Sequence, residues 1–156
     1  MSDSAMTTES TVYVTYIAST PQKVWEGLTS GDFTTQYFFG RSIESDWRAG
    51  SPWMLRKADG SVDVGGKVRT ADPPRKLVVS WVVAGMDLPE AIVTYDIEDL
   101  GGSAVRLTMT EAHPTPIPAT LLEGGRKGWP MILSGLKTLL ETGKSLAIPV
   151  PQPPKT

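Results

Sequence analysis

Hydrophobic and polar residues alternate along most of the chain from residue 11 to residue 112. Residues 11–17 read TVYVTYI, an alternating, β-branched stretch that is typical of a strand. Further stretches of this kind predict strands at 41–47, 52–57, 61–70, 75–83, 90–98 and 103–112. Turn sequences such as Asp59-Gly60 and Gly101-Gly102 separate them, and these residues adopt positive φ at little cost. Such short connections predict an antiparallel meander.

The last two of these predicted strands indicate which face of the sheet is buried. In each strand the odd-numbered positions are mostly apolar and the even-numbered positions are mostly polar. The apolar positions are Val93, Tyr95, Ile97, Val105, Leu107 and Met109. One face of the sheet is therefore expected to be exposed to solvent, and the other to be covered by a single layer of structure.

A long helix near the C-terminus is predicted to form that layer. Its apolar residues follow the i, i+3, i+4, i+7, i+11 spacing of one helical face, and they are Trp129, Ile132, Leu133, Leu136 and Leu140. Gly143 is typical of a helix end. Since Pro130 removes a backbone hydrogen bond, the helix is expected to start near Gly128 or to kink there.

A shorter helix is predicted directly after the first strand. Thr20 can cap it, and Pro21 suits the first helical position. Residues 32–37 could add a second short helix. Together these elements predict an α+β fold, in which a curved antiparallel sheet wraps around the long C-terminal helix.

The chain of 156 residues is expected to form one domain, from 11 to 144, between two tails. Residues 1–10 are polar and are expected to be flexible, and they lack the basic start and apolar stretch of a secretory signal. Residues 145–156 include four prolines and are expected to form an extended tail. No apolar run approaches the roughly 20 residues that cross a bilayer. We therefore expect a cytoplasmic protein without an integral membrane segment.

The composition excludes most enzyme classes that are defined by motifs. The chain has no Cys and one His, so cysteine-based zinc sites, iron–sulfur clusters, thiol nucleophiles and multi-histidine metal sites are excluded. We expect neither a metal nor a cofactor. Lys and Arg total 15 against 17 Asp and Glu, a net charge of −2, so nucleic acid is not an expected partner.

Large apolar side chains on the inner side of the sheet are the most informative candidates for a binding site. A sheet that grips a helix does not close completely at its open end, so such side chains can line a pocket for a small molecule. The same side chains can instead fill the core, and this interpretation is favoured for Trp25, Trp81 and Trp129. The candidate ligand-binding residues are Phe38, Phe39, Trp47, Trp53, Trp81, Tyr95, Met109 and Met131.

Glu111 and His113 are the candidates for catalysis. They share the parity of Leu107 and Met109, so both point inward if the strand persists. A carboxylate and an imidazole in a cleft could act as a general acid–base pair or orient a polar group of a ligand. Pro114 follows directly, however, and favours a solvated loop at His113.

An ordered set of short motifs resembles a known family. The motifs are ASTPQKVWEGLT, GSPW, ADPPRKLVVSW, IVTYDIEDLGGSAVRLTMTEAH and GWPMILSGLKTLLETGK. In this order they resemble the activator of heat-shock protein 90 ATPase homologue-like branch of the START-like, or Bet v 1-like (SRPBCC), superfamily, across residues 11–144. The resemblance implies a helix-grip fold, with a seven-stranded antiparallel sheet around the last helix and a cavity between them. It also implies binding of apolar or amphipathic small molecules, although a few relatives are aromatase/cyclases or hydrolases.

Three functions therefore stay open. The first is a small soluble protein that holds an apolar or aromatic small molecule, such as a lipid, between the sheet and the C-terminal helix. The second is a regulator of a chaperone or other ATPase, which acts through protein–protein contacts. The third is a polyketide cyclase-like or hydrolase-like enzyme that uses Glu111, His113 or Tyr95. The sparse set of catalytic residue types favours binding over catalysis, and a homodimer stays open.

Overall fold

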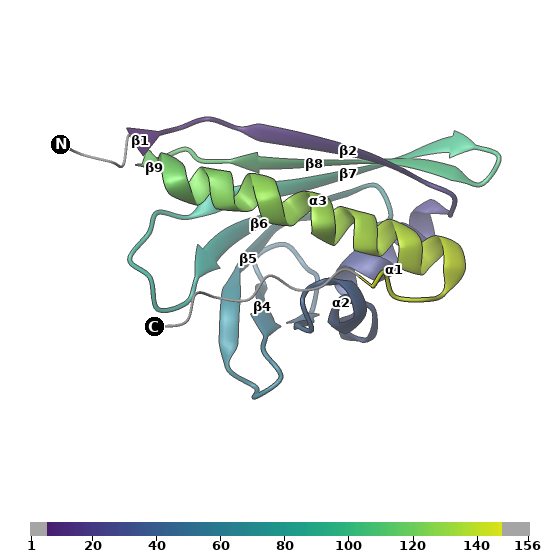
Figure 1. Cartoon of the computed structure of the whole chain (residues 1–156), viewed down its shortest axis with the longest axis horizontal. Coiled ribbons are helices and arrows are strands. Elements are labelled where there is room, and N and C mark those ends of the chain that lie inside the picture. Colours follow the sequence, from purple (N-terminus) through teal and green to yellow (C-terminus); the bar gives the residue numbers. More distant parts are fainter. Residues whose placement is uncertain (1–5, 148–156) are drawn as a thin grey trace.

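A computed structural model describes residues 6–147 and shows a seven-stranded antiparallel sheet that curves around a long helix (Figure 1). The strand order is β2-β8-β7-β6-β5-β4-β3, so β2 and β3 are the edge strands. The strands are β2 (Thr11–Ile17), β3 (Ser42–Ser45), β4 (Pro52–Arg56), β5 (Val62–Asp72), β6 (Lys76–Val83), β7 (Ala91–Gly101) and β8 (Ala104–Ala112). These are the predicted strands, and the predicted helix-grip arrangement is confirmed.

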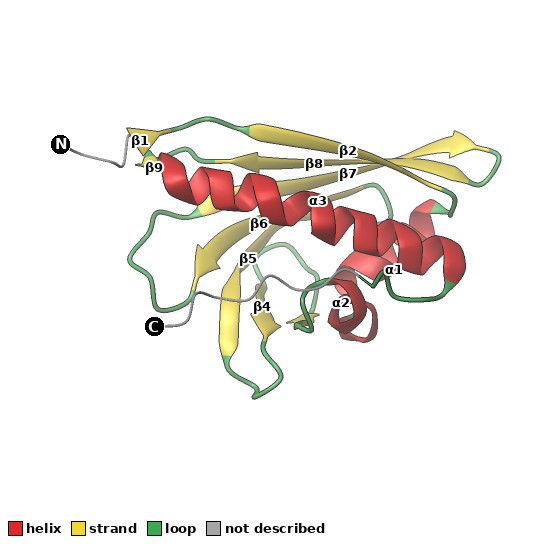
Figure 2. Cartoon of the chain, in the orientation of Figure 1, coloured by secondary structure: helices red, strands yellow, loops and turns green. Residues whose placement is uncertain are grey.

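Three helices accompany the sheet, namely α1 (Pro21–Thr29), α2 (Gly31–Tyr37) and α3 (Ala119–Thr142). Figure 2 shows α3 lying across the sheet, with α1 and α2 beside its C-terminal half. Thr20 caps α1, because its hydroxyl oxygen accepts a hydrogen bond from the backbone N–H of Lys23 at 3.3 Å. Both short helices thus occur where the sequence predicted them.

The long helix begins at Ala119, so of the two outcomes expected from Pro130, a start near Gly128 does not occur. Pro130 lies inside the helix, where it removes one backbone hydrogen bond. Burial of an apolar stripe outweighs that loss, since helices in proteins owe most of their stability to packing. The buried apolar residues of α3 are Leu122, Trp129, Ile132, Leu133, Leu136 and Leu139. Gly143 ends the helix in the left-handed conformation, at φ 77°.

Two short strands lie outside the main sheet. β1 (Met6–Thr7) pairs antiparallel with β9 (Ile117–Pro118), so part of the segment 1–10 that was expected to be flexible is a strand. Of the expected tail, 145–156, the residues from 148 onward lie outside the described residues. Between residues 6 and 147 no helix is long and apolar enough to cross a membrane.

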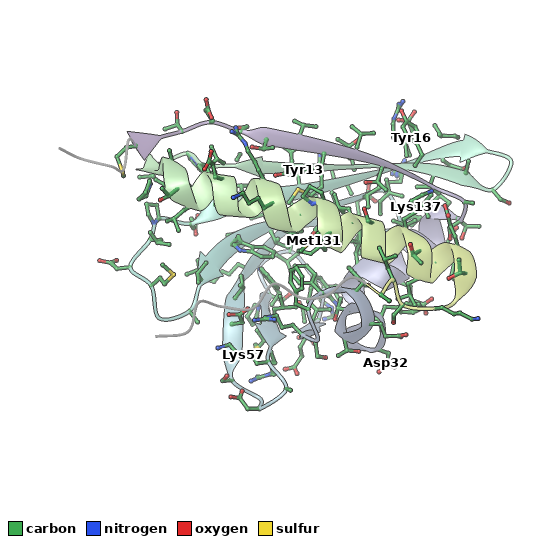
Figure 3. All side chains as sticks on the ribbon, in the orientation of Figure 1. Tyr13, Tyr16, Asp32, Lys57, Met131 and Lys137 are labelled. Atoms are coloured by element: carbon green, nitrogen blue, oxygen red, sulfur yellow. The ribbon has the colours of Figure 1, made fainter. Side chains whose placement is uncertain are left out.

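Polar contacts tie the C-terminal half of α3 to the edge strand β2. Lys137 donates through Nζ to the carbonyl oxygen of Tyr16 at 2.7 Å, and Glu141 accepts from the backbone N–H of Ala18 at 2.8 Å. Figure 3 shows Tyr16 and Lys137 at the same end of the sheet. These contacts fix α3 along the sheet and so position the residues at its other end.

An aromatic cluster fills the middle of the space between sheet and helix. It consists of Phe38, Trp53, Trp81 and Trp129, which we call the central aromatic cluster. The ring centroids of Trp53 and Trp81 lie 5.1 Å apart, and those of Trp81 and Trp129 lie 5.3 Å apart. Tilted contacts at this distance add to the free energy gained by burying the rings.

We expect Thr20→Ala to lower the free energy of unfolding by about 1 kcal/mol, because the first turn of α1 loses the side chain that caps it. Urea denaturation measures this loss. Thr20→Ser, which keeps the hydroxyl, is the control and should stay close to the wild type. Equal losses in both variants would contradict a capping role.

Candidate functional site

The centre of the grip leaves almost no empty space. Phe38, Trp47, Trp53, Trp81 and Tyr95, which the sequence predicted to bind a ligand, border a gap of only about 10 Å³. A gap of that size has room for at most about one water molecule. These side chains therefore fill the centre themselves.

Hydrogen bonds hold two of these indoles as parts of the core. The Nε1–H of Trp53 donates to the carbonyl oxygen of Ser80 at 2.8 Å, and that of Trp47 donates to the carbonyl oxygen of Thr29 at 3.0 Å. Met109 is also completely buried. The two indoles are thus held by hydrogen bonds within the protein, and Met109 is part of the buried core.

Phe39 and Met131 line a different space, an open groove between α2 and α3. The groove has a volume of about 360 Å³, and Gln36 and Leu146 also border it. Met131 is the residue that α3 contributes beside Gly135 to the lining of the groove, and Figure 3 shows its position on this helix. In the described part of the chain no charged side chain lines the groove, so this part offers apolar contact and little chemistry.

A second pocket lies at the β9 end of α3, and we call it the end pocket. Its volume is about 220 Å³. The N-terminal half of α3, the ends of β6 and β8 and the β6–β7 loop enclose it with apolar side chains, among them Trp81, Leu88, Ile117, Leu121 and Trp129. Of the residues that the structure describes, Glu111 and His113 are the only titratable ones in its lining. The end pocket thus unites both predicted catalytic candidates with one predicted ligand-binding residue, Trp81.

His113 is buried, so the expectation of a solvated loop at this position was wrong. Its side chain is 8% exposed, and that of Glu111 is 10% exposed. β8 ends at Ala112, but the following segment turns at once into β9 and α3. Leu121 of α3 and Met86 of the β6–β7 loop share the pocket with His113, and they help to shield it from water.

Three polar atoms of the two titratable side chains lack hydrogen-bond partners in the described part of the chain. His113 Nε2 and Glu111 Oε2 lie 3.8 Å apart, which is too far for a hydrogen bond. In the described part of the chain, Glu111 Oε1 and both ring nitrogens of His113 are buried without any partner. A buried polar group without a partner costs about 1–3 kcal/mol. Nearly all buried polar groups in proteins have a partner, so these atoms mark a place where a bound molecule, water included, can supply one.

Burial moves the pKa values of the pair toward each other. Desolvation raises the pKa of Glu111, while the indole of Trp129 and the guanidinium of Arg126 oppose this rise. Desolvation lowers the pKa of His113. The imidazole is therefore neutral at pH 7 and has one donor and one acceptor nitrogen.

Gly125 makes room for the carboxylate of Glu111. A Cβ atom at this position would lie 3.0 Å from Glu111 Oε1, so any larger residue would press on that oxygen. The sequence did not reveal this role, because the predicted helix began after Gly125. It likewise gave no reason to place the β6–β7 loop or Leu121 beside His113.

The stability of Glu111→Gln is expected to rise relative to the wild type with increasing pH. The unfolded carboxyl has its ordinary pKa of 4.5, and the folded one a higher pKa. The folded wild type therefore loses stability as pH rises from 4.5 through the folded pKa, whereas glutamine has no proton to lose. Because the pKa of His113 is lowered in the folded state, the wild type and the variant both gain stability as the pH rises to 6.5. This gain cancels in the difference between the two proteins. Urea denaturation across the range measures the difference, and a constant difference would contradict a desolvated carboxylate.

Solved structures with this fold include proteins of different kinds. A crystal structure of an HSP90 activator from Plasmodium falciparum is 18% identical with a TM-score of 0.71, and the match covers 84% of this chain and 95% of that one. CalU16 from Micromonospora echinospora is 21% identical with a TM-score of 0.68, over 90% and 87% of the two chains. The Aha1 dimer from Colwellia psychrerythraea is 18% identical with a TM-score of 0.70, over 88% and 99%. These identities establish a shared fold.

A comparison with curated proteins found no match. The family model described as "Activator of Hsp90 ATPase homolog 1-like protein" matches residues 18–141, which is most of the chain from α1 to the end of α3. The resemblance that the sequence motifs indicated is thereby confirmed. The chain belongs to the activator of Hsp90 ATPase homolog 1-like family.

Proposed function

We propose that this protein binds a small, largely apolar molecule with a hydrogen-bonding group in the end pocket. The observation that carries the proposal is the burial of Glu111 and His113, with unpartnered polar atoms, in the wall of an otherwise apolar pocket. Ligand sites commonly combine apolar walls with a few placed polar groups.

The size of the end pocket limits the ligand. Its volume of about 220 Å³ is below the roughly 300–1,000 Å³ of pockets for drug-sized molecules. A single ring system with a short polar chain suits this space. The indoles of Trp81 and Trp129 would contact the ring, and the Glu111–His113 pair would contact the polar group.

A pocket-filling variant tests the proposal. Leu121 lines the end pocket and is 38% exposed. Leu121→Trp can therefore place an indole in the pocket without disturbing the core. The matched control is Leu146→Trp, at a 37% exposed leucine on the α2–α3 groove. In ligand-observed NMR against a set of aromatic fragments, we expect hits for the wild type and Leu146→Trp that disappear in Leu121→Trp. Hits that persist in Leu121→Trp, or an absence of hits for the wild type, would overturn the proposal.

Acid–base catalysis by the same pair is a second candidate function. It is supported by the opposite pKa shifts of Glu111 and His113 within one pocket, since such shifts suit groups that exchange protons near pH 7. One protein of this fold, DynU16, is described as belonging to the dynemicin biosynthetic locus. It is 23% identical with a TM-score of 0.74, and the match covers 87% of this chain and 48% of that one. Mass spectrometry of a bound fragment after incubation tests the idea: conversion by the wild type but not by Glu111→Gln supports it, and an unchanged fragment contradicts it.

Regulation of a chaperone ATPase is a third candidate, and the edge strand β2 supports it. Val12, Val14 and Tyr16 each expose half or more of their surface on one face of this strand, and an exposed apolar edge strand is suited to pairing with an extended segment of a partner. If this protein stimulates a purified Hsp90 ATPase, Val14→Lys should abolish the stimulation. Thr94→Lys, on the same face of the inner strand β7, is the control. Equal stimulation by both variants would contradict a role for β2.

A further inference from the structure

We infer that the molecule bound in the end pocket is an organic cation, namely an amine attached to an aromatic or aliphatic body. The inference rests on the proposed binding function and specifies its ligand class. Three features of the pocket carry it: a buried carboxyl, an aromatic wall and a neutral imidazole.

The carboxyl of Glu111 lacks a cation to neutralise it. Among residues 6–147, its only recorded ion-pair contact is with His113, at 3.8 Å, and that imidazole is neutral at pH 7 because burial lowers its pKa. Arg126 acts on Glu111 from α3, but its guanidinium donates to Glu9 at 3.0 Å and to Thr11 at 3.2 Å. The Oε1 atom of Glu111 therefore has no hydrogen-bond partner among the described residues, and an ammonium group that reached it would form a charge-assisted hydrogen bond.

Two indole rings line the pocket beside this carboxyl. Trp81 and Trp129 lie 5.3 Å apart at an angle of 60°, and both border the same space as Glu111. The faces of indole rings carry negative partial charge and attract cations. A carboxylate next to two such rings favours a cationic over an anionic ligand.

The remaining polar groups of the pocket also suit a ligand that donates hydrogen bonds. Neutral His113 offers an acceptor nitrogen to a second N–H of the amine. Burial, and to a lesser degree the charge of Glu111, raises the pKa of the hydroxyls of Tyr13 from β2 and Tyr95 from β7. Among residues 6–147, no Lys or Arg side chain lines the pocket, so a ligand carboxylate would meet Glu111 without a balancing cation from this part of the chain.

Three compounds of nearly equal shape test this inference: phenethylamine, phenethyl alcohol and hydrocinnamate. Their polar groups are cationic, neutral and anionic, and their phenyl groups are the same. Binding is followed by calorimetry and by the shift of the Trp129 indole N–H in NMR spectra. We expect phenethylamine to bind about tenfold or more tightly than phenethyl alcohol, since charge-assisted hydrogen bonds are worth roughly 1.5–3 kcal/mol. In Glu111→Gln this preference should disappear, while the alcohol binds as before.

The outcomes separate the two proposals. If the alcohol or hydrocinnamate binds as tightly as phenethylamine, the ligand is not a cation, yet binding in the end pocket stands. If none of the three shifts Trp129, both proposals fail. If Glu111→Gln keeps the preference for phenethylamine, the carboxyl is not the recognition group and the inference is overturned. Thermal unfolding of Glu111→Gln without ligand verifies that the variant is folded.

Discussion

Gly66→Ala is expected to lower the free energy of unfolding by about 3 kcal/mol or more, the upper range for overpacking. A Cβ atom at this position would lie 2.1 Å from the carbonyl oxygen of Ser80 and 2.7 Å from its hydroxyl. Both oxygens are in use, because the first accepts from Trp53 Nε1 and the second from the backbone N–H of Lys67, each at 2.8 Å. Relief of the clash would separate β5 from β6 and release Trp53 from its anchor.

Urea denaturation measures this loss, and Gly124→Ala is the matched control. Gly124 lies inside α3, and apart from its chain neighbours and the nearby backbone of the helix, no described atom lies within 4 Å of its added Cβ. Alanine is preferred over glycine in a helix by about 1 kcal/mol, so this variant should be as stable as the wild type or more stable. If Gly66→Ala were as stable as Gly124→Ala, the close approach of β5 and β6 would be refuted.

Trp53→Ala is expected to cost about 3–5 kcal/mol, which is typical of a large aromatic residue lost from a core. Trp53 is buried in the central aromatic cluster, and its loss leaves a cavity and an unpartnered carbonyl at Ser80. Added indole should occupy the cavity, since apolar cavities of this kind bind apolar molecules.

Thermal unfolding with and without indole measures both effects. We expect indole to raise the melting temperature of Trp53→Ala by several degrees and that of the wild type by much less. An equal rise in both proteins would mean that the wild-type centre has room for indole, contrary to the gap of about 10 Å³. A small loss of stability in Trp53→Ala would mean that the cluster does not hold the core together.

The sequence predicted the sheet well because its signals are local. Alternation placed Val105, Leu107 and Met109 on the buried face, and each of these positions is decided by the period of the strand itself. The apolar stripe and Gly143 likewise predicted the C-terminal part of α3, because the stripe has helical spacing and the glycine follows it as a typical helix end.

The sequence predicted the candidate site less well because that site depends on packing between distant segments. Pro130 suggested a late start for α3, and this error hid the contacts of Leu121 and Gly125 with the pocket. His113 follows the end of β8 and precedes a proline, so local reasoning placed it in water. Its burial depends on where α3 and the β6–β7 loop fold, which no pattern near residue 113 reveals.

The single histidine offers the most direct measurement of the central claim, that the end pocket is the ligand site. Because the chain contains one His, its imidazole nitrogens give unambiguous NMR signals. In the free protein we predict that His113 titrates below its ordinary pKa of 6.5, and that phenethylamine shifts its nitrogen signals saturably in the wild type but not in Leu121→Trp. A histidine that titrates at 6.5 and does not respond to any of the three probe compounds would contradict the account.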